Sequence, residues 1–340
     1  MQYPTPPHAR PASDRGLYWL IGLAVASTLA LACALPVLAQ TAPAGATAPA
    51  APPPVPTDAI RTVVADHGLV GEFYAPPTPG KHPAILVLGG SEGGLQGSVP
   101  LARRLANEGY ATFAVAYFGA PGVPGQLDLL PLEYFRQALD WLEARPDVDA
   151  KRIGIVGGSK GAEAALEIAA RYPDIKVVVV GAPSSVAWQS LNFAVETSSW
   201  TEGGKPVPFV PYDRSKPFTS VYAVYAGALP ALPKDSPAII PVERINGPVL
   251  LVSGQADSLW PSGPMSDQVM ARLDERHFRF RHEHLSYPDA GHAAFGAPIA
   301  ADNPRLPMLT QLGGTVAGNL AARADGWPKV LAFLKAALHP

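Results

Sequence analysis

The chain has 340 residues, of which 48% are hydrophobic and 16% charged, and its formal net charge is −2. High apolar content with so little net charge excludes a disordered chain, and the lack of a basic surplus argues against a nucleic-acid-binding protein. The single cysteine, Cys33, excludes a disulfide scaffold or a multi-cysteine zinc site within one chain. The length suits one large α/β domain or two small ones.

Residues 1–39 are typical of a secretory signal peptide. Residues 17–40 carry no charge and are mostly apolar, two arginines precede them, and small or aliphatic residues stand at 37–39 before the expected cleavage point. An uncleaved anchor is the alternative, because about 20 apolar residues can span a bilayer. We therefore expect a periplasmic or secreted protein, or one whose only membrane contact is an inner-membrane anchor at residues 17–38.

An Ala/Pro-rich linker is expected at residues 40–58, because this composition builds no core and behaves as a semi-extended spacer. The folded domain is then 59–340. It shows no internal repeat.

Strand and helix patterns alternate through the folded domain. Residues 62–75 predict an opening hairpin, and apolar runs predict buried strands at 84–88, 111–117, 153–156, 177–180 and 249–252. A further strand is predicted at 278–286. Helices are predicted at 99–108, 132–144, 160–172, 264–275 and 326–338, the last with an apolar stripe of Trp327, Leu331, Leu334 and Leu338. The alternation predicts an α/β fold, with a mainly parallel sheet and helices on both faces.

A long irregular insertion at about 184–247 interrupts this alternation. It is rich in proline and in aromatic residues, namely Trp188, Phe193, Trp200, Phe209, Tyr212, Phe218, Tyr222 and Tyr225. Such an insertion in a compact domain is usually a lid or a binding loop. A structural excursion over a sheet edge is the alternative. We expect a lid whose aromatic side chains line an apolar pocket.

The pattern G-x-S-x-G occurs twice, around Ser91 and around Ser159. A nucleophile elbow needs a strand, a sharp turn and an immediate helix, whose N-terminus favours developing negative charge. A strongly helical sequence follows Ser159, whereas glycines and a proline follow Ser91. The elbow is therefore predicted at Ser159.

The Ser91 loop has a different expected role. It follows an early buried strand, where the α/β-hydrolase fold places its oxyanion-hole loop. The backbone amides of Ser91 or Glu92 would pair with that of Lys160 to bind an oxyanion. A plain glycine-rich turn is the alternative. Neither glycine cluster completes a phosphate-binding motif.

A base and an orienting acid are also required by a serine nucleophile. Asp257 follows the strand at 249–252, and His292 follows the strand at 278–286 in a loop of small residues. Parallel strands place their active sites at the carboxyl edge, and the order Ser, acid, His is that of an α/β-hydrolase. The catalytic residues are therefore predicted to be Ser159, Asp257 and His292.

Other residues compete for these roles. Asp289 is an alternative acid, although such a residue more often braces the histidine loop. His277, His282 and His284 lie within or at the start of a predicted strand. His282 and His284 share a face, but no third metal ligand accompanies them, so neither a metal nor an organic cofactor is expected.

Four segments carry a resemblance to a known family. They are EYFRQALDWLEARPDVDAKRIGIVGGSKGAEAALEIAARYP, INGPVLLVSGQADSLWPS, YPDAGH and GGTVAGNLAARADGWPKVLAFL. Together they resemble the dienelactone-hydrolase-like α/β-hydrolase domain of the acyl-CoA thioesterase and bile acid-CoA:amino acid N-acyltransferase family. The resemblance implies a Ser/Cys–Asp–His triad, which falls on Ser159, Asp257 and His292. Some members add an N-terminal β-sandwich domain, which we do not expect before this hydrolase part.

The expected activity is hydrolysis of a small acyl ester or thioester through an acyl-enzyme on Ser159. The conjugating acyltransferases of the family use cysteine, so a serine favours water as the acceptor. Acyl transfer to an amine or alcohol is the alternative, and a non-catalytic envelope binding protein is a third reading.

Overall fold

The computed structural model describes residues 58–215, 217–304 and 306–338. The predicted signal peptide and nearly all of the predicted linker lie outside these residues. Within the described ranges, no helix combines the length and apolar character needed to cross a membrane.

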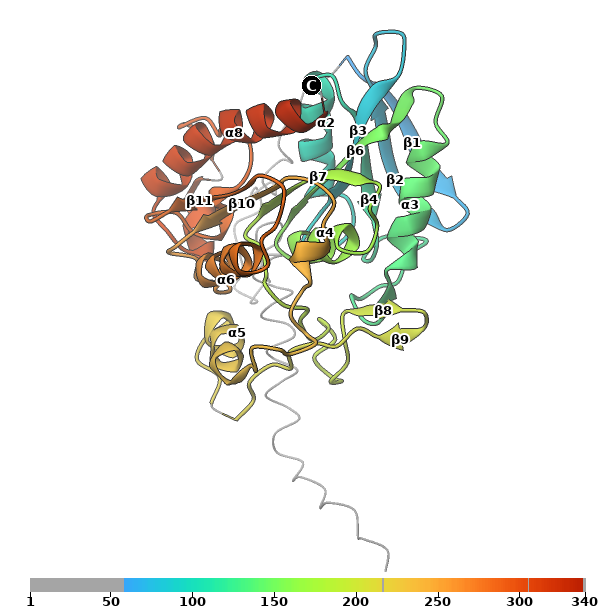
Figure 1. Ribbon diagram of the computed structural model, residues 1–340. Helices are drawn as coiled ribbons and strands as arrows, with labels where there is room; N and C mark the ends of the chain where they lie inside the picture. The colour runs from blue at the N-terminus through green and yellow to red at the C-terminus, as the bar shows by residue number, and fades with distance from the viewer. Residues whose placement is uncertain (1–57, 216, 305, 339–340) are drawn as a thin grey trace, which may run out of the picture.

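An eight-stranded sheet forms the centre of the fold (Figure 1). The strand order is β1-β2-β4-β3-β6-β7-β10-β11. From β4 to β11 all neighbours are parallel, whereas β1 and β2 form an antiparallel edge. The strands are β1 (Ile60–Asp66), β2 (Leu69–Ala75), β3 (His82–Leu88), β4 (Ala111–Ala116), β6 (Val148–Gly158), β7 (Ile175–Gly181), β10 (Val249–Gly254) and β11 (His282–Tyr287).

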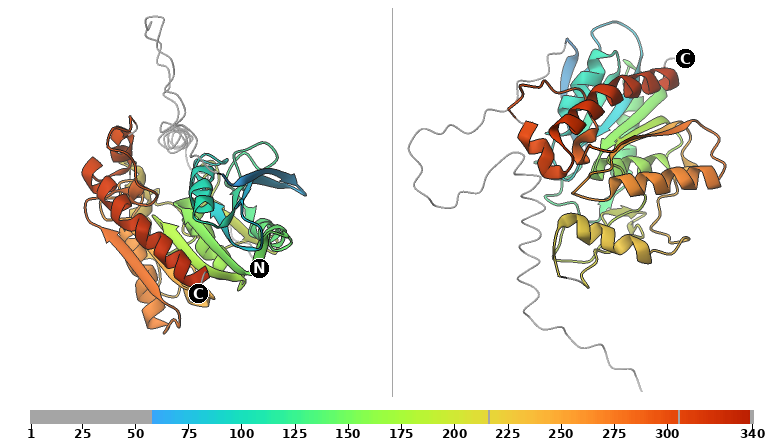
Figure 2. Two further views of the ribbon diagram at one scale, coloured as in Figure 1. Left: turned by 90° about the horizontal axis from the view of Figure 1, so that it is seen from above. Right: turned by 90° about the vertical axis from the view of Figure 1, so that its left-hand side faces the viewer.

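Helices cover both faces of the sheet, as predicted. Strand side chains alternate between the faces: Ile85 and Val87 pack with α2 (Ser98–Asn107) and α8 (Val316–Leu338). Leu86 and Leu88 pack with the helices of the other face, α3 (Glu133–Glu143), α4 (Lys160–Ala169) and α6 (Ser262–Glu275). Figure 2 shows α8 lying across the strands on its face. The central strands are apolar throughout because both of their faces are buried.

Several predicted boundaries are wrong. The strand predicted at 153–156 spans Val148–Gly158, and the helix predicted at 160–172 ends at Ala169. The last helix begins at Val316, ten residues before the predicted start at 326, and it contains Pro328. Its first turns were missed because they contact the protein through the polar side chains of Asn319 and Arg323 instead of an apolar stripe. The last strand begins at His282 and not at 278. His277 is therefore outside the strand, in a left-handed conformation (φ 52°) after α6.

The 184–247 insertion contains short elements of its own. A three-stranded sheet joins β5 (Leu130–Pro131) to β8 (Trp200–Glu202) and β9 (Lys205–Pro206). In Figure 1, α5 (Val221–Ala228), β8 and β9 lie below α4 and α6, past the ends of the central strands. The remaining short helices are Leu229–Ala231, Val242–Arg244, His292–Ala294, α7 (Leu306–Leu309) and Thr310–Leu312.

Candidate active site

Ser159 occupies a strained turn between β6 and α4. Its φ of 56° and ψ of −123° are rarely adopted by residues other than glycine. The turn is also tight, since a Cβ on Gly157 would lie 2.2 Å from the carbonyl oxygen of Gly161. Helix α4 begins at Lys160, so the amide of Lys160 has no acceptor within the helix. The geometry is that of a nucleophile elbow.

The Ser91 loop passes directly beside this turn. A Cβ on Gly90 would lie 3.1 Å from the Cβ of Ser159. The Glu92 carboxylate accepts a hydrogen bond from the Gly90 amide at 2.9 Å and another from its own amide. Of the two predicted loop donors, the Ser91 amide is therefore better placed to donate a hydrogen bond to a ligand, because the Glu92 amide already donates to its own carboxylate. No helix follows at once, because α2 starts only at Ser98.

Asp257 and His292 are in contact at the carboxyl edge of the sheet. Nδ1 of His292 lies 2.8 Å from Oδ2 of Asp257, and the two side chains are 7% and 2% exposed. Oδ1 of Asp257 accepts hydrogen bonds from the amides of Leu259 and Trp260, at 2.9 and 3.2 Å. Oδ2 also accepts one from the Ser262 hydroxyl at 2.5 Å. These donors hold the carboxylate in one orientation toward the histidine.

A segment before α8 links the acid loop to the histidine loop. Gly313 pairs with Asp257, and Gly314 pairs with Ala290. The Asn319 side chain accepts a hydrogen bond from the Gly291 amide at 3.0 Å. Sequence reasoning missed this bracing role and that of Ser262. The Gly313-Gly314 pair ahead of a helix was the available signal, because both glycines have positive φ.

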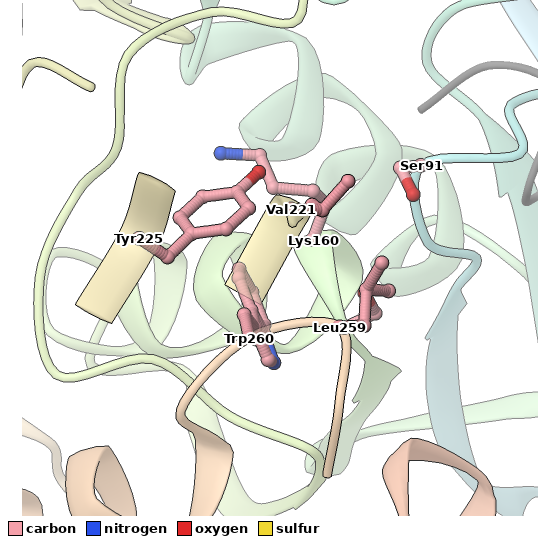
Figure 3. A pocket seen from close by; sticks show the side chains of 7 residues that line it. Ser91, Lys160, Val221, Tyr225, Leu259 and Trp260 are labelled. Atoms are coloured by element: carbon pink, nitrogen blue, oxygen red, sulfur yellow. The ribbon is translucent and has the colours of Figure 1, made fainter. Parts of the chain in front are cut away.

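A pocket opens beside the elbow (Figure 3). Nε2 of His292 is buried and has no hydrogen-bond partner among the described residues, Ser159 included. The Trp260 ring packs edge-on against the His292 ring, with centroids 5.9 Å apart. The hydrogen bond between a serine nucleophile and Nε2 of its histidine base often forms only when substrate is bound. The pocket is lined by Ser91, Ser159, Lys160, Val221, Tyr225, Leu259 and Trp260.

A buried ion pair lies under the elbow. Nζ of Lys160 is 2.7 Å from Oε2 of Glu163, and both side chains are at most 2% exposed. Nζ also donates to the Ser199 hydroxyl at 2.9 Å. Oε1 of Glu163 accepts from the Trp188 amide and the Trp200 indole, at 3.1 and 2.8 Å. Burial lowers the pKa of the Lys160 ammonium, and Glu163 opposes that effect. The network joins α4 to the 184–247 insertion.

A second serine, histidine and aspartate lie together where β10, β11 and α6 meet. Oγ of Ser253 is 2.7 Å from Nε2 of His284, and Nδ1 of His284 is 3.2 Å from Oδ1 of Asp267. We call these three residues the Ser253 cluster. Its serine is completely buried, and none of the three residues lines the pocket beside Ser159.

The remaining candidates do not converge on a site. Nε2 of His282 lies 2.9 Å from Asp274, so His282 and His284 have separate acidic partners. No group of three or more metal-ligating side chains occurs in the described part of the chain. Asp289 contacts Thr315 through its backbone carbonyl, and the acid that meets His292 is Asp257.

Only part of the aromatic set of the insertion reaches the pocket. Tyr225 lines it, whereas Trp188 and Tyr212 lie behind Tyr225. Trp200 belongs instead to the main core. The second aromatic ring of the pocket, Trp260, comes from the loop after Asp257 and was not predicted.

Comparison with solved structures shows the fold. A dienelactone hydrolase-like promiscuous phosphotriesterase from metagenomic libraries superposes with a TM-score of 0.51 at 18% identity, over 82% of this chain and 98% of that one. An acylaminoacyl peptidase from Pyrococcus horikoshii gives a TM-score of 0.53 at 16% identity, over 82% of this chain and 41% of that one. The predicted α/β-hydrolase fold is confirmed.

Comparison with curated proteins identifies relatives. Human mitochondrial acyl-coenzyme A thioesterase 2 is 30% identical over 271 residues, which are 77% of this chain and 54% of that protein. Mouse bile acid-CoA:amino acid N-acyltransferase is 30% identical over 289 residues, which are 82% of this chain and 66% of that protein. The chain thus matches between about half and two thirds of the length of these relatives. Residues 130–340, more than half of the chain, match the family described as BAAT / Acyl-CoA thioester hydrolase C terminal, and the protein is a member of that family.

Proposed function

We propose that this protein is a serine hydrolase that cleaves acyl esters or thioesters of small molecules. The observation that carries the proposal is the arrangement around His292. Asp257 holds Nδ1 at 2.8 Å, while the buried Nε2 has no partner among the described residues. The His292 ring packs against Trp260, which lines the same pocket as Ser159. A base with one nitrogen fixed and the other free suits proton abstraction from a hydroxyl in that pocket.

In the proposed first half-reaction, Oγ of Ser159 attacks the acyl carbon and Nε2 of His292 takes the hydroxyl proton. Asp257 keeps the imidazole in the required tautomer and stabilises the imidazolium. The tetrahedral oxyanion accepts hydrogen bonds from the amides of Lys160 and Ser91, each worth roughly 2.7–4 kcal/mol in the transition state. Collapse expels the alcohol or thiol, which receives its proton from His292.

In the second half-reaction, His292 removes a proton from water as the water oxygen attacks the acyl-enzyme. The same two amides hold the second oxyanion. Collapse breaks the bond to Oγ, returns the proton from His292 to Ser159 and releases the carboxylic acid. These steps use only side chains and amides of this chain.

A fluorophosphonate probe tests the proposal directly. We expect covalent labelling of the wild type, with the modified peptide containing Ser159, and no labelling of Ser159→Ala. Ser91→Ala is the matched control, because Ser91 belongs to the other G-x-S-x-G match and contributes its amide only. Labelling at Ser91, or no labelling of folded wild type, would contradict the proposal.

Acyl transfer to an amine or alcohol is the second candidate. The similarity to mouse bile acid-CoA:amino acid N-acyltransferase favours it. Product analysis separates the two activities: a hydrolase releases free acid whether or not an amino acid or an alcohol is added, whereas a transferase forms the conjugate. Export from the cytoplasm is also part of our proposal, and N-terminal sequencing of the mature protein tests it.

A further inference from the structure

The pocket beside Ser159 ends at a wall of aromatic side chains. Tyr225 and Trp260 are 5% and 2% exposed, whereas Ser91 and Val221 at the other parts of the lining are only half-buried. In Figure 3, Tyr225 and Ser91 stand on opposite sides of the pocket. The buried end therefore lies toward Tyr225 and the open end toward Ser91.

Tyr225 is held by rings on several sides. Its ring lies 4.9 Å from Trp188, 5.2 Å from Tyr212 and 5.6 Å from Trp260, each in an edge-to-face arrangement. Its hydroxyl is 3.4 Å from that of Tyr212, which in turn donates to the Gln189 carbonyl at 2.9 Å. Edge-to-face pairs and buried hydrogen bonds each stabilise such a cluster. Because Tyr225 is fixed in this way, the wall does not yield to a longer ligand without breaking several contacts.

The space in front of this wall is small. The space between these side chains amounts to about 240 Å³ with its open mouth included. Apart from Ser91, Ser159 and Lys160, the lining is formed by Val221, Leu259 and the rings of Tyr225 and Trp260. The Lys160 ammonium is already paired with Glu163. Such a space accepts a short, uncharged acyl group.

We infer that Tyr225 sets the acyl length and that the substrates are esters or thioesters of short-chain acids. This inference rests on the proposed function and adds the substrate class to it. The acyl group points from Ser159 toward Tyr225, and the alcohol or thiol leaves on the Ser91 side. Tyr225 is a specificity-determining residue, since it bounds the acyl group and takes part in no bond change.

The test measures kcat/KM of the full 340-residue chain for p-nitrophenyl acetate, butyrate, octanoate and dodecanoate. A constant leaving group isolates the effect of acyl length. We expect the wild type to prefer acetate or butyrate. Tyr225→Ala removes the wall, and the ratio of kcat/KM for octanoate to that for acetate should rise by at least about 10-fold, the lower end of the range for accommodating a single methylene in an apolar pocket.

Tyr225→Phe is the matched control, because it keeps the ring and should leave the ratio as in the wild type. Val221→Ala enlarges the pocket at a half-buried position, so it supplies the same test, with a smaller rise, if Tyr225→Ala does not fold. Wild type that prefers octanoate or dodecanoate would overturn this inference but not the proposed function. Folded Tyr225→Ala and Val221→Ala that both keep the wild-type preference would do the same. Wild type that turns over no ester or thioester and resists the fluorophosphonate would overturn the proposed function as well.

Discussion

Two groups of serine, histidine and aspartate lie in this molecule, and their hydrogen bonds are distributed unequally. In the Ser253 cluster, Oγ of the serine is 2.7 Å from Nε2 of His284. At the elbow, Nε2 of His292 has no partner among the described residues. Judged by hydrogen bonds alone, the Ser253 cluster would be the more complete triad.

Access and backbone geometry separate the two groups. Ser253 is completely buried within β10, whereas Ser159 lines a pocket, has a positive φ and precedes a helix. Asp257 receives three hydrogen bonds besides that of His292 and is 2% exposed, whereas Asp267 is 66% exposed. The comparison teaches that a serine can act as a nucleophile only where its hydroxyl is accessible to substrate and nearby backbone amides are free to bind an oxyanion. Three residue types in contact are not enough.

The largest expected difference between the two groups is in the serines. Ser159→Ala should lower kcat by roughly 10⁵–10⁶-fold, because it removes the nucleophile. Ser253→Ala should leave kcat unchanged and cost about 1–3 kcal/mol in unfolding free energy, because it leaves a buried ring nitrogen of His284 unpaired. Steady-state kinetics and urea denaturation measure both. Loss of turnover in Ser253→Ala with intact folding would reverse the assignment.

The acids should differ next. Asp257→Asn should lower kcat by roughly 10⁴-fold, because the amide favours the wrong tautomer of His292. Asp267→Asn is the matched control and should retain wild-type kcat, since its carboxylate faces solvent and serves only the Ser253 cluster. Equal losses in the two variants would show that the two groups act together.

The charges that support each group should differ in their contribution to stability. Lys160→Met should cost about 3–5 kcal/mol in unfolding free energy, because it leaves the buried Glu163 carboxylate uncompensated. Adding Glu163→Gln should recover part of this loss, since the amide oxygen can still accept from Trp188 and Trp200. Asp267→Asn should change the unfolding free energy by no more than about 1 kcal/mol, as for exposed pairs. A double variant less stable than Lys160→Met would contradict this account.

The smallest expected effect is a pH dependence of the Ser253 cluster. Burial lowers the pKa of His284 below its ordinary value of 6.5, against the attraction of Asp267. Below pH 6.5 the unfolded chain therefore binds a proton at this histidine more readily than the folded chain does. The neutral form of His284 therefore contributes to the stability of the folded chain. This contribution is complete above pH 6.5 and is lost as the pH falls through the lowered pKa of the folded state.

We expect His284→Gln to reduce the fall of Tm between pH 7 and pH 5 relative to wild type. His67→Gln is the control, since the His67 side chain is 87% exposed. Thermal denaturation across this pH range checks the difference. A steeper acid loss in His284→Gln would show that protonated His284 stabilises the fold.

Much of the fold could be predicted from the sequence. The apolar runs at 84–88, 153–156 and 249–252 fall within β3, β6 and β10 because a strand buried on both faces must be apolar throughout. The starts of α8 and β11 could not be predicted, because the polar contacts of Asn319 and the turn at His277 leave no periodic pattern in the sequence. Periodicity reports which face is apolar and is silent about polar contacts.

The sequence by itself determined the order of the elements and the three residues expected at the site. Ser159, Asp257 and His292 each follow a strand of one parallel sheet, so chain connectivity alone brings them to one edge. Only the tertiary structure decided which side chains close the pocket and hold the acid. Trp260 comes from an irregular loop, Ser262 from the first turn of α6, and the ring cluster around Tyr225 from segments far apart in the chain. Their meeting depends on side-chain packing in three dimensions, for which the linear pattern carries no signal.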